Sequence, residues 1–273
     1  MTQAIETRTA QSGALRIAYD DAGQGEPALL FMNGWGANRT VWRKVIPLAS
    51  QHRRVINMDW RGHGDSETPA SDFGASDLVA DALAVIEASG AQRIVPVANA
   101  HSGWIAIELR RRLGDRIAGL ALVDWIITEA PPPFLAALQG LQDPDHWEQA
   151  RDALIGMWLA GAVDPDERAF VTNTMARTSK EMWARSGREI GAAYAAAGSP
   201  LKALAALTPP VPTLHVYAMP DDPGYLAAQL AYAAEHPWFQ VSKLDTTGHF
   251  PMFPAADKIA AAIEVFVRGS VAG

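Results

Sequence analysis

The chain has 273 residues, of which 49% are hydrophobic and 19% are charged, a composition that excludes an intrinsically disordered protein. Its formal net charge of −7, without a basic tract, argues against nucleic acid and anionic membranes as partners, and the absence of cysteine excludes disulfides, thiolate nucleophiles and zinc–thiolate sites. No run approaches the length of about 18 apolar residues that a membrane-spanning helix needs, and the N-terminus has no secretion-signal pattern, so we expect a cytoplasmic protein.

Short apolar segments alternate with amphipathic ones in the first part of the chain. Residues 5–10 and 15–19 are expected to pair as an antiparallel edge. Runs typical of buried strands follow at 28–32, 55–58, 94–97, 120–123 and 214–217. Helical patterns lie between them, at 77–89 and 104–113. This alternation predicts an α/β protein with a doubly wound, mostly parallel sheet and helices on both faces.

The pattern changes near Trp125. A proline run at 131–133 interrupts the chain, and from there to about Leu207 the patterns are helical and no strand stands out. We interpret residues 127–207 as a helical cap inserted between two parts of the α/β core, 1–126 and 208–273. The Trp and Met side chains of the cap have two explanations: packing of a small helical layer, or the lining of an apolar ligand pocket.

A glycine-rich string, Asp59-Trp60-Arg61-Gly62-His63-Gly64-Asp65-Ser66, follows the strand at 55–58. Its glycines permit a tight backbone path after the strand. The string resembles the D-x-R-G-x-G-x-S turn of the α/β-hydrolase superfamily, and by that resemblance its role is structural. We therefore do not expect His63 to be catalytic.

Upstream, Asn33-Gly34-Trp35-Gly36 follows the strand at 28–32. In α/β-hydrolase-like proteins the loop at this place supplies one backbone N–H of the oxyanion hole. The resemblance implies that the N–H of Trp35 is that donor here. The alternative is a plain glycine turn.

The segment Val97-Ala98-Asn99-Ala100-His101-Ser102-Gly103-Trp104 follows a strand and opens a helix, as a nucleophile elbow does. The apex position, which carries Ser, Asp or Cys in such elbows, is Ala100. A methyl group cannot attack a substrate, so the elbow cannot form an acyl-enzyme. Ser102 stands where packing requires a small residue, and we expect it to contact the substrate rather than to act as a nucleophile.

Near the C-terminus, Gly248-His249 follows an expected strand at 241–244 and precedes the last helix, where α/β-hydrolase proteins keep their catalytic histidine. Neutral imidazole is a competent base near pH 7. A base needs an orienting acid, and two places qualify. Asp124 ends the strand at 120–123, while Asp221 or Asp222 follows the strand at 214–217; we favour Asp124 because of the family match described next.

From about residue 15 to 268 the chain resembles the cofactor-independent 2,4-dioxygenases of the α/β-hydrolase fold, which cleave 3-hydroxy-4(1H)-quinolone rings. The resemblance implies an eight-stranded, mostly parallel sheet with an inserted helical cap. The stretches that carry it are Gly34-Trp35, Trp60-Arg61-Gly62-His63-Gly64, His101-Ser102-Gly103-Trp104, Val123-Asp124-Trp125, Met157-Trp158-Leu159-Ala160-Gly161, Trp183-Ala184-Arg185-Ser186-Gly187-Arg188, Glu235-His236-Pro237-Trp238-Phe239 and His249-Phe250-Pro251. The chain departs from the family at Ala100, where a Ser is usual, at Asn99, where a His is expected, and at residues 37–38, which replace a more polar stretch.

The resemblance implies a reaction that needs a base but no nucleophile. His249 would remove the 3-hydroxyl proton, Asp124 would fix the tautomer of His249, and the backbone N–H groups of Trp35 and His101 would steady developing oxyanion charge. The substrate anion would then react with O₂ without metal, flavin or other cofactor, and carbon monoxide would leave.

By the same resemblance the partners are a small aromatic heterocycle and O₂, and we expect a monomer. Trp35, Trp158 and Trp183 are candidates for stacking on a flat bicyclic substrate, although packing between cap and core explains each of them equally well.

Two other functions stay open on the residues alone. The chain could be a serine ester or amide hydrolase in which the elbow Ser is replaced by Ala100. It could also be a non-catalytic receptor for aromatic ligands built on the hydrolase fold. A haloalkane dehalogenase or epoxide hydrolase is disfavoured, because both require an Asp at the elbow apex.

Overall fold

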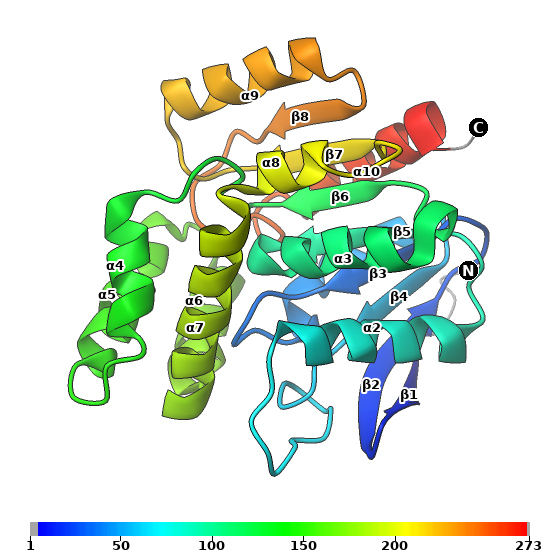
Figure 1. The fold of residues 1–273 in the computed structure, drawn as a ribbon. Helices are drawn as coiled ribbons and strands as arrows, with labels where there is room; N and C mark the ends of the chain where they lie inside the picture. Colours follow the sequence, from blue (N-terminus) through cyan, green and yellow to red (C-terminus); the bar gives the residue numbers. More distant parts are fainter. Residues whose placement is uncertain (1–4, 272–273) are drawn as a thin grey trace.

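The computed structural model describes residues 5–271, and eight strands of that part of the chain form one sheet (Figure 1). The strands are β1 (Glu6–Ser12), β2 (Leu15–Ala22), β3 (Ala28–Met32), β4 (Val55–Met58), β5 (Ile94–Asn99), β6 (Leu120–Val123), β7 (Thr213–Tyr217) and β8 (Phe239–Lys243). Their order is β1-β2-β4-β3-β5-β6-β7-β8; β2 pairs antiparallel with β1 and with β4, and the remaining neighbours are parallel. The predicted antiparallel edge and mostly parallel sheet are confirmed.

The last strand begins earlier than the expected 241–244. β8 starts at Phe239, which pairs with Thr213 of β7, and it ends at Lys243. Only Phe239 is fully buried along this edge strand, since β8 has one neighbour in the sheet. A strand that is half exposed carries polar residues such as Gln240 and Ser242, so a search for an apolar run places its start too late.

Ten α-helices of residues 5–271 surround the sheet (Figure 1). They are α1 (Ile46–Ala49), α2 (Ala75–Ser89), α3 (Gly103–Leu113), α4 (Pro132–Gly140), α5 (Trp147–Gly161), α6 (Pro165–Asn173), α7 (Lys180–Ala197), α8 (Pro200–Ala205), α9 (Pro223–Glu235) and α10 (Ala256–Phe266). Short 3₁₀ turns occupy Arg39–Trp42, Ala100–Ser102, Gly114–Arg116 and Met175–Arg177, and a π turn occupies Val267–Val271. None of the helices in this described part has the length and apolar character that crossing a bilayer requires.

Both faces of the sheet are buried, as the apolar strands predicted. Leu29 and Phe31 of β3 belong to one apolar cluster, which includes residues of α1 and α10. The alternate residues Leu30 and Met32 belong to a second cluster, which includes residues of α2 and α3. Alternation along a strand sends successive side chains to opposite faces, and burial of each large one contributes about 1.5–3 kcal/mol. Figure 1 shows α2, α3 and α8 in front of the sheet, and α9 packs against β8.

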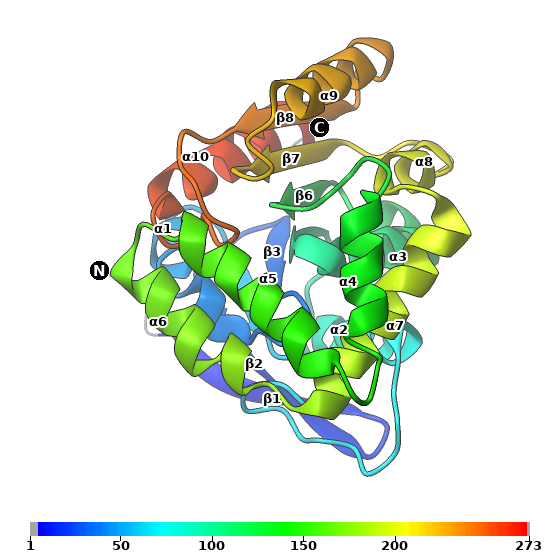
Figure 2. The ribbon, with the colours of Figure 1, turned by 90° about the vertical axis from the view of Figure 1, so that its left-hand side faces the viewer.

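The segment between β6 and β7 is helical throughout its regular structure. Pro131 caps α4 and Pro132 occupies its first turn, so the proline run opens a helix, a position in which the missing N–H costs nothing. Figure 2 shows α4, α5 and α6 in front of the strands, beyond the carboxyl ends of β6 and β7. α8 instead packs against α3. The division into core and cap at residues 126/127 and 207/208 stays a prediction.

Candidate active site

Four chain segments meet at one edge of the sheet, because parallel strands end in the same direction. They are residues 33–36 after β3, 99–102 at the end of β5, 124–125 after β6 and 218–219 after β7. Ala100 (φ +49°) and Asp124 (φ +50°) are the only non-glycine residues between 5 and 271 with a left-handed backbone. This conformation is strained for residues with a Cβ, and such strain concentrates at functional sites. The edge is therefore the first place to search for chemistry.

His249 and Asp124 form a hydrogen-bonded pair at this edge. Nδ1 of His249 lies 2.9 Å from Oδ2 of Asp124, and the other carboxylate oxygen accepts the N–H groups of Ala218 (2.8 Å) and Met219 (2.9 Å). Asp124 is 1% exposed at its side chain and His249 is 26% exposed. Because the carboxylate can only accept, Nδ1 carries the hydrogen and Nε2 carries the lone pair. The arrangement presents a base.

Asp124 is the acid that lies beside His249. The two alternatives after β7, Asp221 and Asp222, have other partners. Asp222 accepts the N–H of Tyr225 at 2.6 Å and caps α9. Asp221 is exposed and lies 3.2 Å from Nζ of Lys243. Whether the two paired residues are catalytic stays a proposal.

A cavity of about 280 Å³ opens beside the pair. The predicted Trp35, Trp158 and Trp183 all line it, together with His249 and Ala100. Trp158 stacks on His249 with ring centroids 5.3 Å apart and 13° between the planes, and Trp183 stacks behind Trp158 at 6.1 Å and 26°. The remaining wall is mainly apolar: Ala37, Trp125, Ile126, Pro131, Phe134, Leu138, Leu141, Leu154, Met157, Met175, Ile190, Met219, Pro220 and Phe250. Such a space suits a flat, largely apolar ligand.

Ser102 does not lie on this cavity, which corrects the expectation that it contacts a substrate. Its side chain is buried, and its hydroxyl lies 2.8 Å from the carbonyl oxygen of Asn99 and 3.2 Å from that of Met32. The hydroxyl therefore ties the elbow to β3. The packing role that its position favoured accounts for this residue fully.

The backbone N–H group of Trp35 belongs to the loop after β3, and that of His101 to the residue that follows the elbow apex. Neither of them donates to another group of residues 5–271. The two segments are close, because a Cβ placed on Gly34 would lie 3.6 Å from Cβ of Ala100. The oxyanion-hole prediction for Trp35 and His101 is consistent with this geometry and stays a prediction.

The glycine-rich string after β4 holds the Trp35 loop in place. Nε2 of His63 accepts the N–H of Gly36 at 3.0 Å, and its Nδ1–H donates to the carbonyl of Arg61 at 2.9 Å. The indole N–H of Trp60 donates to the carbonyl of Asn33 at 2.6 Å. Burial lowers the pKa of His63 to about 4, so its ring stays neutral and can accept. His63 is structural, as predicted.

Glu167 of α6 lies under the His249 turn and was missed by sequence reasoning. It is fully buried; its Oε1 accepts the N–H of Phe250 at 3.2 Å, and its Oε2 has no partner within residues 5–271. Gly248 (φ +100°) lets the turn approach, since a Cβ there would lie 2.4 Å from Oε1. Burial raises the pKa of Glu167 to about 7. Nothing in the local pattern of α6 marks this glutamate as buried.

Glu167→Gln is expected to raise the free energy of unfolding by about 1–2 kcal/mol at about pH 8.5 and to leave it nearly unchanged at about pH 4. The pKa of the Glu167 carboxyl is 4.5 in its ordinary state and about 7 in the folded protein, so between these two pH values the folded state binds the proton more tightly than the unfolded state. The contribution to stability is therefore complete below pH 4.5 and is lost as the pH rises through 7. Urea unfolding at the two pH values measures the difference in the free energy of unfolding between Glu167→Gln and the unaltered protein. The exposed Glu148→Gln is the control, and equal shifts in both variants would refute the assignment.

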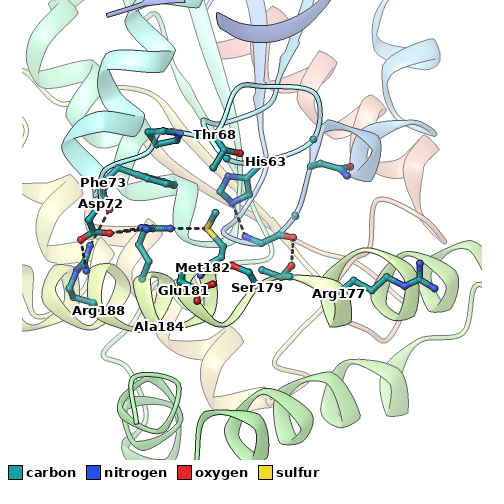
Figure 3. Close-up of a pocket in the computed structure, with 18 of the residues that line it drawn as sticks. His63, Thr68, Asp72, Phe73, Arg177, Ser179, Glu181, Met182, Ala184 and Arg188 are labelled. Carbon is teal, nitrogen blue, oxygen red and sulfur yellow. Dashed lines mark hydrogen bonds and ion pairs between the residues drawn. The ribbon is translucent and has the colours of Figure 1, made fainter. Parts of the chain in front are cut away.

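A second, larger hollow of about 980 Å³ lies outside the Trp35 loop, between residues 68–73 and α7 (Figure 3). Two of its arginines, Arg188 and Arg185, both pair with Asp72 (2.9 and 2.8 Å). Phe73, which lines the hollow, stacks on Trp35 at 6.1 Å and 18° and so helps to separate it from the inner cavity. Since the hollow lacks the acid–base pair, we take the inner cavity as the candidate active site.

The sequence profile of the alpha/beta hydrolase family matches residues 29–262. A 2-heptyl-3-hydroxy-4(1H)-quinolone dioxygenase of Mycobacteroides abscessus is 35% identical over 259 residues, which cover 94% of this chain and 96% of the relative. The chain belongs to the quinolone dioxygenase family of the alpha/beta hydrolases. A Rhodococcus erythropolis enzyme named 2-heptyl-3-hydroxy-4-quinolone dioxygenase is 36% identical over 260 residues, 94% of this chain and 96% of that enzyme.

A solved structure of the quinolone dioxygenase family, an AqdC variant in complex with its substrate, the Pseudomonas quinolone signal, superimposes with a TM-score of 0.91. It is 34% identical and covers 97% of this chain and 100% of that one. The predicted α/β-hydrolase fold is thereby confirmed. Within the quinolone dioxygenase family this chain has Ala100 at its elbow apex, so its chemistry has to proceed without a hydroxyl there.

Proposed function

We propose that this chain cleaves the heterocyclic ring of a 3-hydroxy-4(1H)-quinolone with O₂ and releases carbon monoxide, using His249 as the base. The observation that carries the proposal is the His249–Asp124 pair facing an aromatic-lined cavity beside an elbow that ends in a methyl group. Relatives that match nearly the whole chain are named for the 2-heptyl compound, which favours a substrate with a 2-alkyl chain.

The first step is transfer of the 3-hydroxyl proton to Nε2 of His249. Asp124 keeps the lone pair on Nε2 and stabilises the imidazolium that forms, because its buried carboxylate lies 2.9 Å from Nδ1. A positioned base of this kind typically contributes about 10²–10⁴ to the rate. The step requires no covalent bond between protein and substrate, so Ala100 is no obstacle to it.

The substrate anion then supplies the electrons that reduce O₂. One oxygen of O₂ bonds to C2 and the second closes onto C4, which gives a cyclic peroxide. The O–O bond of this peroxide and the bonds from C3 to C2 and C4 then break. C3 leaves with its own oxygen as carbon monoxide, and both atoms of O₂ remain in the ring-opened N-acylanthranilate. The N–H groups of Trp35 and His101 are the proposed donors to the oxyanions that develop.

Binding is proposed to depend on flat stacking and on burial of the alkyl chain. Trp35 and Trp183 are proposed to offer aromatic faces to the bicycle and Trp158 its edge, because Trp158 is itself stacked on His249 and Trp183. The apolar wall formed by residues such as Leu138 and Leu154 offers space for the chain. Each buried CH₂ contributes about 0.8 kcal/mol, so a heptyl compound should bind far more tightly than a methyl compound.

The direct test is anaerobic mixing of the protein with a 2-alkyl-3-hydroxy-4-quinolone, followed by admission of O₂. We expect the absorbance of the bound anion to appear before O₂ is added, and one carbon monoxide to be released per substrate afterwards. Absence of the anion at neutral pH, or ring opening without carbon monoxide, would contradict the proposal.

We also propose that the reaction needs no metal or organic cofactor and that the chain acts as a cytoplasmic monomer. A net charge of −7 favours repulsion between copies. Extensive dialysis against a chelator should leave the rate unchanged, and light scattering should give the mass of one chain. A rate that falls on dialysis and returns with an added ion would refute the cofactor-free mechanism.

Ala100→Ser distinguishes this proposal from a serine hydrolase. The added hydroxyl would supply at most one hydrogen bond, worth about 0.5–1.5 kcal/mol, so quinolone cleavage should change by no more than about tenfold. Hydrolysis of aryl esters should remain marginal. Strong esterase activity of Ala100→Ser, in a protein that never cleaves quinolones, would support the hydrolase instead.

A further inference from the structure

The side chain of His101 lines the same cavity as His249, although the mechanism above uses only its backbone. Its Nδ1 lies 3.1 Å from the indole Nε1 of Trp125. An indole nitrogen can donate a hydrogen bond but cannot accept one. Nδ1 of His101 must therefore carry the lone pair, and the hydrogen of the neutral ring sits on Nε2.

The indole that imposes this tautomer is held rigidly. Trp125 is 1% exposed, and its carbonyl accepts the hydroxyl of Tyr225 at 2.7 Å. Its ring lies against the backbone of Gly103, where an added Cβ would approach Cζ3 to 2.2 Å. Trp104 meets it edge-on at 5.0 Å. These contacts hold the indole in the orientation in which it donates to His101.

The ring of His101 is fixed from its other sides as well. Phe134 stacks on it at 5.5 Å and 13°, and Tyr194 meets its edge at 5.9 Å. Burial, with a further contribution from His249, lowers the pKa of His101 to about 3. The ring therefore stays neutral throughout the physiological range, and it can do so while His249 becomes charged.

The two histidines offer opposite groups to the cavity. His249 directs Nδ1–H to Asp124 and keeps its lone pair on Nε2, whereas His101 keeps its hydrogen on Nε2. Neither Nε2 has a hydrogen-bond partner within residues 5–271. Neither is one of the fully buried, unpartnered polar atoms of that part of the chain, so both remain accessible to a ligand. The cavity thus contains one acceptor and one donor from imidazole rings.

We propose that Nε2–H of His101 donates a hydrogen bond to an oxygen of the bound 3-hydroxy-4-quinolone and stabilises its anion, while Nε2 of His249 takes the proton. The inference rests on the proposed function. It assigns to His101 the donor role that a hydroxyl at the elbow apex would otherwise supply and that Ala100 cannot. Trp125 acts through His101 and is a positioning residue.

The test is anaerobic titration of 2-heptyl-3-hydroxy-4-quinolone with pH, following the absorbance of the bound anion in four proteins: unaltered, His101→Phe, Trp125→Phe and Trp42→Phe. A lost hydrogen bond to an anion should weaken anion binding by about 10- to 100-fold, which raises the apparent pKa of the bound substrate by about one to two units in His101→Phe. Trp125→Phe should shift it in the same direction by a smaller amount.

Trp42→Phe is the matched control, because it removes a buried indole that does not line the cavity and whose Nε1 has no partner among the described residues. It should leave the titration unchanged. Equal titrations in the unaltered protein and His101→Phe would overturn this inference alone, and a missing anion in the unaltered protein would overturn the proposed function with it.

A second measurement does not depend on any variant folding. In ¹⁵N spectra of histidine-labelled unaltered protein, His101 should show the Nε2–H tautomer and should not titrate between about pH 5 and 8. An Nδ1–H tautomer, or titration within that range, would overturn the inference.

Discussion

His249→Ala is expected to lower kcat for quinolone cleavage by about 10²–10⁴, with the folded structure intact. The imidazole carries the lone pair at Nε2 that removes the substrate proton, because Nδ1 is committed to Asp124. An alanine methyl group cannot take that proton, and the bound substrate should then remain neutral in the absence of O₂. Stopped-flow absorbance separates loss of anion formation from loss of the later O₂ step.

The control for this substitution is His146→Ala, which removes an exposed histidine of the cap that has no predicted catalytic or binding role. It should retain the full rate. Thermal unfolding should show that His249→Ala is folded, since this side chain is only partly enclosed. If His249→Ala bound the quinolone and retained all measurable function, the chain would be a receptor for aromatic ligands and the dioxygenase proposal would fail.

Asp124→Asn is expected to have an effect of similar size, about 10²–10⁴ on kcat, for a different reason. The amide oxygen would keep the two hydrogen bonds from Ala218 and Met219, and the NH₂ group would then face Nδ1 of His249. Nδ1 would have to accept, so the hydrogen would move to Nε2. The ring would present a donor where the reaction requires a base.

Binding of the quinolone should be affected much less than kcat in Asp124→Asn, so steady-state kinetics should show a fall in kcat with a small change in KM. Asp221→Asn is the matched control: it removes the exposed carboxylate that follows β7 and pairs with Lys243. It should leave both constants unchanged. A larger loss in Asp221→Asn than in Asp124→Asn would mean that His249 is oriented from β7 in solution.

The positions of the strands along the chain, and of the turns that follow them, are largely encoded in local sequence. The runs at 28–32, 55–58 and 120–123 match β3, β4 and β6, because a strand buried on both faces has to be continuously apolar. α9 was missed, although Asp222 at its cap and Pro223 at its first position are the usual signals of a helix start. Its exposed, alanine-rich surface hid the periodicity.

The candidate residues Asp124, His249, Trp35 and Ala100 could be found from sequence because each follows a strand, and parallel strands bring such positions together. Their partnership could not be derived in the same way. Asp124 and His249 are 125 residues apart, and the sequence left Asp221 and Asp222 open as alternatives. Only the register of β6 and β7 and the path of the loops bring one carboxylate to 2.9 Å from Nδ1.

The amino-acid sequence by itself determined the fold class, the family resemblance and the absence of a nucleophile at the elbow, because these depend on periodicity and on the chemistry of single positions. The tertiary structure decided which groups are available for chemistry. Ser102 lies outside the cavity, Glu167 is buried beneath the His249 turn, and the hydrogen bond from Trp125 sets the tautomer of His101. Each of these depends on contacts across elements, where burial and hydrogen-bond direction are properties of the packed chain and not of a local pattern.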